Sequence, residues 1–176
     1  MLASFYFHEQ SFDPRATARC WGAKVPLPYG PGDGPPGLQA NRDFLAAHRA
    51  SVGADFPLTV DCYMSLTVPY AIDLANTVRD LNLYWMEECL QPDGFDGHTL
   101  LKTRAPWMKW TTDEHEYTRY GFRKLIETRS VDILQPDMRW LGGLTEAMRV
   151  AAMAAAYDIP SDEPASVSSC ARTRII

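Results

Sequence analysis

The 176-residue chain lacks the features that mark several common classes of protein. Its four cysteines form no C-x-x-C pair and have no zinc-site spacing, which indicates buried free thiols in a reducing compartment. Basic residues are scattered and the net charge is −5, so we expect no nucleic-acid partner. The N-terminus has no basic segment followed by a long apolar one, and no stretch is long enough to span a membrane. We therefore expect a cytoplasmic protein with no membrane partner.

What the chain does contain is ordinary for a soluble globular protein. Hydrophobic residues make up 46% of it and charged residues 22%. This length is sufficient for one domain with a sizeable hydrophobic core.

Strand-like and helix-like segments alternate along the chain. The strand-like segments are 3–8, 23–30, 56–60, 83–88, 106–116 and 131–137, and the helix-like segments are 13–22, 41–52, 69–82, 97–105, 118–130 and 143–160. This alternation predicts an α/β fold with a parallel sheet. Two architectures fit: an open doubly wound sheet and a (β/α) barrel. No glycine-rich phosphate loop follows the first strand, which removes the best evidence for the open nucleotide-binding form.

An acidic residue ends each of four consecutive strands. These residues are Asp61, Glu87, Glu114 and Asp137. A single acid in this position is often a helix N-cap or a solvated loop charge, but the recurrence favours a shared role. Because the carboxyl ends of the strands in a parallel barrel open on one face, these side chains are expected to converge.

Converging carboxylates in a pocket of low dielectric constant repel one another and tend to take up protons. A hard divalent cation removes that conflict. Mg²⁺ prefers carboxylate oxygens in octahedral geometry, so the pattern predicts a magnesium site. Glu88, which follows Glu87, is expected to point to the other side of the strand as a solvated or salt-bridged neighbour.

Several motifs resemble a known family when they are taken in order. They are KVPLPYGPGDG, DCYMSL, WMEECLQPD, EHEYTRYGFR and ILQPDMRWLGGLTE. Together they are similar to the barrel domain of the enolase superfamily, within it to the mandelate-racemase-like sugar-acid dehydratases, and in particular to the L-rhamnonate dehydratases. The resemblance extends from about Phe5 to Pro160.

The resemblance implies a partial TIM-type barrel over residues 1–160, with about six βα units and without the family's capping domain or its last strands. Residues 161–176 are rich in serine and charge and have no periodicity, so we expect an unrelated, disordered tail. A shifted reading frame or a retained intron would account for the abrupt change. An open sheet edge would also favour pairing with another copy, as a homo-oligomer.

The implied activity is magnesium-dependent removal of water from an aldonic acid such as L-rhamnonate, which gives a 2-keto-3-deoxy acid through an enediolate. Enzymes of this superfamily use a Lys or His side chain as the base beside magnesium, and the resemblance implies the same chemistry here. By resemblance, Asp61, Glu87 and Glu114 are the Mg²⁺ ligands, Asp137 orients a catalytic histidine, and His115 faces the substrate. Lys24 lies where other branches have a base lysine pair, but Pro26 takes the second position, which argues against a lysine base.

One departure from the family pattern leaves two alternatives open. The expected histidine after Asp137 is missing, because His115 is the last histidine in the sequence. The chain is either a divergent or incomplete enzyme of this family, or a non-catalytic remnant. The remnant would at most bind a divalent metal or associate with a full-length homologue.

Overall fold

A parallel sheet forms the centre of the computed structural model, which describes residues 3–6, 20–112, 114–162 and 174–175. Its strands are β1 (Ala3–Tyr6), β2 (Cys20–Pro26), β3 (Leu58–Asp61), β4 (Trp85–Glu87), β5 (Trp110–Thr112), β6 (Ile133–Leu134), β7 (Ser161–Asp162) and β8 (Arg174–Ile175). They lie in the sheet in the order of the chain, and β1 to β7 are parallel, while β8 is antiparallel to β7. The predicted α/β fold with a parallel sheet is confirmed.

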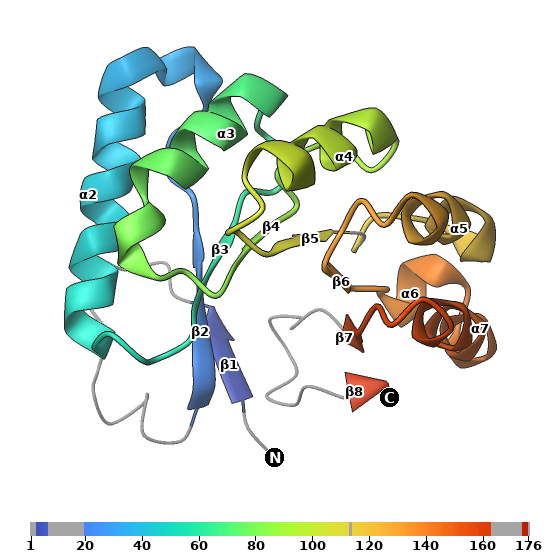
Figure 1. The fold of residues 1–176 in the computed structure, drawn as a ribbon. Coiled ribbons are helices and arrows are strands. Elements are labelled where there is room, and N and C mark those ends of the chain that lie inside the picture. Colours follow the sequence, from blue (N-terminus) through green and yellow to red (C-terminus); the bar gives the residue numbers. More distant parts are fainter. Residues whose placement is uncertain (1–2, 7–19, 113, 163–173, 176) are drawn as a thin grey trace.

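The helices lie in an arc on the outer side of the curved sheet (Figure 1). They are α2 (Gly34–Val52), α3 (Val68–Thr77), α4 (Phe95–Arg104), α5 (Thr118–Thr128), α6 (Met138–Leu141) and α7 (Leu144–Ala155), with short 3₁₀ turns at Pro31–Asp33 and Arg79–Leu81. The described helices that connect successive parallel strands from β2 to β7 therefore lie on the same side of the sheet, as in a (β/α) barrel. Among the described strands, no pairing joins β1 to β8.

Two element boundaries differ from the prediction near the N-terminus. Strand β2 begins at Cys20, so the last residues of the helix predicted over 13–22 are extended, and residues 13–19 lie outside the described part. Helix α2 begins at Gly34, well before the predicted start at Asn41. The prolines at the start of α2 are compatible with the helix, because a proline in the first turn sacrifices no hydrogen bond.

The expected tail contributes to the sheet at its start. Ser161 pairs with Leu134 of β6, and residues 161–162 form β7 instead of a disordered segment. Residues 163–173, where most of the expected tail falls, lie outside the described part.

The hydrophobic core has two parts. One packs strands β2 to β5 against helices α2 to α4 and includes Val25, Leu45 and Met86. The other includes Phe122 on α5 and Val150 on α7. No helix among the described residues is long and apolar enough to cross a membrane.

Arg49 near the end of α2 fixes the loops that lead into β3 and β4. Its buried guanidinium donates hydrogen bonds to the carbonyl oxygens of Leu81 (2.7 Å), Gly53 (2.8 Å), Phe56 (2.6 Å) and Asn82 (2.8 Å). Backbone carbonyls at these loops would otherwise need water as a partner. These four hydrogen bonds fix where β3 and β4 begin, and the same two strands end in Asp61 and Glu87.

Candidate functional site

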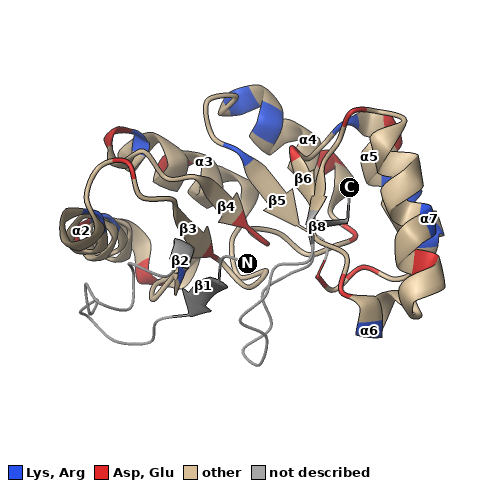
Figure 2. Ribbon diagram, turned by 90° about the horizontal axis from the view of Figure 1, so that it is seen from below, with Lys and Arg blue, Asp and Glu red and all other residues tan. Residues whose placement is uncertain are grey.

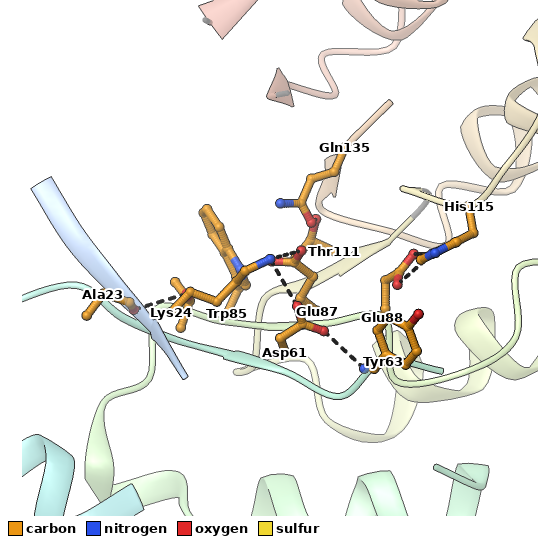
Figure 3. Close-up of polar contacts among 11 residues, drawn as sticks. Ala23, Lys24, Asp61, Tyr63, Trp85, Glu87, Glu88, Thr111, His115 and Gln135 are labelled. Atoms are coloured by element: carbon orange, nitrogen blue, oxygen red, sulfur yellow. Dashed lines mark hydrogen bonds and ion pairs between the residues drawn. The ribbon is translucent and has the colours of Figure 1, made fainter. Parts of the chain in front are cut away.

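Two acidic strand ends meet at one lysine. Asp61 and Glu87 are register partners at the carboxyl ends of β3 and β4, and both side chains are buried. Figure 2 shows these strand ends in red, next to each other. The Nζ atom of Lys24 on β2 lies 3.0 Å from Asp61 Oδ2 and 2.8 Å from Glu87 Oε1 (Figure 3). Three neighbouring strands therefore each contribute one charged side chain to a single buried cluster.

Every carboxylate oxygen of this acid pair has a partner inside the protein. Asp61 Oδ1 accepts a hydrogen bond from the backbone N–H of Tyr63 (3.0 Å), and Glu87 Oε2 accepts one from Trp85 Nε1 (3.2 Å). Burial alone would lower the pKa of Lys24, but the charges of Glu87 and Asp61 outweigh burial and raise that pKa above its usual value. The cluster is thus a charged ammonium between two buried acids.

Glu114, the third predicted ligand, lies half-buried just beyond β5. The pKa of its carboxyl is raised to about 7, mainly by burial; Lys24 opposes this rise, and the acids Glu87, Glu88 and Asp61 add to it. The carboxyl group of Glu114 therefore interacts electrostatically with Lys24, Asp61 and Glu87. However, no three His, Cys, Asp or Glu side chains in the described part are spaced to hold a metal ion, and Asp61 and Glu87 converge on Lys24 instead.

His115, the predicted substrate-facing residue, binds Glu88. Its Nδ1 lies 2.9 and 3.0 Å from the two carboxylate oxygens of Glu88, which is 1% exposed. Burial raises the pKa of Glu88, and the hydrogen bond from His115 opposes that rise. The two predicted alternatives for Glu88 were a solvated and a salt-bridged side chain. The structure has the second, with His115 as the partner. Its backbone is left-handed (φ 47°), so the chain leaves the strand alternation at this residue.

Aromatic rings surround His115 on the same face. The ring of Tyr63 lies 5.7 Å from the imidazole and that of Trp140 lies 5.0 Å from it, both edge-on, and Tyr117 is 5.5 Å from Trp140. These three aromatic side chains are exposed. None of the three was predicted as a site residue from the sequence, although each follows the end of a strand. They place apolar ring faces beside a polar imidazole, an arrangement suited to a ligand with both C–H and hydroxyl groups.

Asp137 caps a helix. Its Oδ1 accepts a hydrogen bond from the backbone N–H of Arg139 (2.6 Å) at the start of α6, which is the N-cap alternative noted in the sequence. The buried polar side chain after β6 is Gln135, whose Oε1 accepts a hydrogen bond from Thr111 Oγ1 (2.6 Å; Figure 3). Gln135 was also missed, because an amide at a strand end has no charge to mark it.

Of the four cysteines, Cys62 and Cys89 are buried free thiols next to the acidic strand ends, as predicted. Their sulfur atoms are 3.6 Å apart. The side chains of the other two cysteines lie outside the described part.

Comparisons with known proteins agree with the α/β fold described above. A sequence model of the enolase C-terminal domain-like family matches residues 23–172. An L-rhamnonate dehydratase from Saccharopolyspora erythraea is 47% identical over 137 residues, which are 77% of this chain and 35% of the relative. The crystal structure of L-rhamnonate dehydratase from Gibberella zeae is 54% identical with a TM-score of 0.83, over 91% of this chain and 41% of that one. The rhamnonate dehydratase of the same organism complexed with Mg has the same identity and TM-score, over 91% of this chain and 39% of that one.

The chain thus spans between 35% and 41% of the length of these relatives. The matched part contains all of the acidic strand ends described above.

Proposed function

The chain belongs to the enolase C-terminal domain-like family, and from this premise we propose that its acidic strand ends form the cation and substrate site of a sugar-acid dehydratase of the L-rhamnonate type. The observation that supports this proposal is the pair Asp61 and Glu87, two buried acids in register at the carboxyl ends of adjacent parallel strands. That face of a (β/α) sheet is where enzymes of this architecture place their active sites.

The donor set suits Mg²⁺. Asp61, Glu87 and Glu114 supply hard carboxylate oxygens, and the ammonium group of Lys24 between the first two acts as a stand-in cation. These three acids would hold the ion. When bound, Mg²⁺ would attract the carboxylate of an aldonic acid and stabilise negative charge that develops on it.

His115 is the proposed proton donor to the departing hydroxyl group. An ionised Glu88 can only accept hydrogen bonds, so the contact with His115 places a proton on Nδ1 and fixes the ring. When the ring also carries a proton on Nε2, as the imidazolium, that proton can pass to the departing substrate hydroxyl, which leaves as water while Nδ1 keeps its contact with Glu88. The rings of Tyr63 and Trp140 would hold the carbon chain of the sugar acid beside it.

We propose no general base within this chain. His115 is the last histidine in the sequence, and the Oδ1 atom of Asp137 is engaged in capping α6. A positioned base contributes a factor of about 10²–10⁴ to rate. The 176-residue chain alone is therefore expected to bind the cation and turn over L-rhamnonate weakly or not at all, which keeps the non-catalytic alternative as the second candidate.

Isothermal titration of Mg²⁺ into the chain, followed by an assay of 2-keto product from L-rhamnonate, tests the proposal. Asp61→Asn should weaken Mg²⁺ binding. Asp80→Asn, which removes an exposed ion pair with Arg42, should leave it unchanged. Equal Mg²⁺ affinities for all three proteins would refute the site. Robust magnesium-dependent turnover by the chain alone would refute the expectation of weak activity and would show that another group acts as base.

A further inference from the structure

The position of Lys24 has a consequence beyond the proposed ligand set. Its ammonium group lies between the two acids that would bind the cation, within 3.0 Å of both. We propose that Lys24 is the resident counter-cation of the Asp61–Glu87 pair, and that a divalent cation binds there only by displacing it. This inference rests on the proposed cation site and concerns how that site changes between its two states.

All four oxygen atoms of the acid pair are already occupied. Asp61 Oδ2 and Glu87 Oε1 both face Lys24 Nζ, and the other two oxygens accept hydrogen bonds from Tyr63 N and Trp85 Nε1. An ion coordinated between the two acids would need the oxygens that face Lys24. The ammonium group therefore occupies the space where the ion would be held.

The charges of the ammonium group and of a divalent cation also oppose each other in this cluster. Lys24, Asp61 and Glu87 are all buried, so charges in this cluster are poorly screened by water. A divalent cation within contact distance of the same two oxygens would lie close to the ammonium and repel it. Because repulsion between like charges is strong in such a place, the ammonium and the ion exclude each other. The lysine side chain can move, since its four-carbon stem is flexible.

The lysine also explains how the acid pair is tolerated without an ion. Two adjacent buried carboxylates would repel each other, and one shared ammonium offsets that repulsion while it links β2 to β3 and β4. The site is then assembled before the cation arrives. The consequence is a lower affinity for the cation than the same acids would have alone.

Replacement of the lysine tests the proposal. Lys24→Met removes the charge and keeps the length of the side chain, and Lys24→Gln serves as a second variant that retains a polar end group. Lys102→Met is the control, because Lys102 forms a partly exposed ion pair with Asp132 at the same distance (3.0 Å), away from the acid pair. Mg²⁺ affinity is measured by isothermal titration, and the melting temperature is measured with and without Mg²⁺.

We expect both Lys24 variants to bind Mg²⁺ about tenfold more tightly or better, because the ion no longer competes with a buried ammonium. Their cation-free forms should melt at a lower temperature, and Mg²⁺ should raise that temperature more than it does in the wild type. Lys102→Met should match the wild type in Mg²⁺ affinity. Unchanged or weaker binding by the Lys24 variants, with clear binding by the wild type, would overturn this inference and leave the proposed cation site intact. If neither the wild type nor any variant bound Mg²⁺, the proposed cation site itself would be overturned.

Discussion

Replacement of Glu87 by Gln removes one charge from the buried cluster without a change of shape. The carboxylate of Glu87 accepts one hydrogen bond from Lys24 Nζ and one from Trp85 Nε1. A glutamine has a single side-chain acceptor, and its NH₂ group would face a donor, because neither Lys24 Nζ nor Trp85 Nε1 can accept. The variant therefore loses at least one hydrogen bond and sets the buried NH₂ group against another donor.

The size of the effect follows from the contacts that remain. A hydrogen bond to a charged group contributes about 1.5–3 kcal/mol, and removal of one partner of a buried ion pair costs about 3–5 kcal/mol. Lys24 still pairs with Asp61 (3.0 Å), so the second figure is an upper limit. We expect Glu87→Gln to lower the free energy of unfolding by about 2–4 kcal/mol, a large part of the roughly 5–15 kcal/mol typical of a protein.

Urea unfolding of the chain at pH 7, followed by tryptophan fluorescence and circular dichroism, measures this loss. The matched control is Glu127→Gln, because Glu127 pairs with Arg123 on the exposed face of α5 at 3.8 Å, and such surface pairs contribute about 0–1 kcal/mol. A Glu87→Gln variant within about 0.5 kcal/mol of the wild type, with an unchanged dependence on urea, would refute the reasoning.

Three further predictions concern neighbouring residues. The pKa of Glu114 is raised to about 7, so between about pH 4.5 and 7 the folded state holds a proton that the unfolded state has lost, and the free energy of unfolding falls as pH rises through that window. Glu114→Gln should flatten this fall when urea unfolding is measured at a series of pH values. His115→Ala should cost about 1–3 kcal/mol of unfolding free energy at pH 7, because it leaves the buried carboxylate of Glu88 without its partner, and His115→Asn should recover part of that loss in the same unfolding assay. Arg49→Met should lower the free energy of unfolding by about 3–5 kcal/mol in thermal or urea unfolding, because four carbonyl groups lose a charged donor. A loss below about 1 kcal/mol would contradict the role of Arg49 in fixing the loops before β3 and β4.

The strand ends were predictable from the sequence because their signal is local. An apolar run that ends in an acid, repeated between helical segments, predicts both the parallel sheet and the positions of Asp61 and Glu87 at the ends of β3 and β4. The N-cap alternative for Asp137 was also predictable, since it depends only on the residues that follow.

The pairings within the site were not predictable, because they depend on contacts between distant residues. Lys24 and Glu87 are 63 residues apart, and their ion pair requires the register of three strands. The contact between Glu88 and His115 requires a left-handed backbone at Glu88, which the sequence does not mark because the residue is not a glycine. Strand β7 has only two residues, too few for a period-two pattern to appear.

The most direct test of the central claim is a crystal structure of the chain grown with Mn²⁺, a scatterer that can replace Mg²⁺ at oxygen sites. We expect one anomalous peak at the carboxyl ends of β3 to β5, within bonding distance of carboxylate oxygens of Asp61, Glu87 and Glu114. The ammonium group of Lys24 should have moved away from Asp61 and Glu87. An acid pair that still contacts Lys24 at 2.8–3.0 Å, with no peak beside it at saturating Mn²⁺, would contradict the proposed cation site.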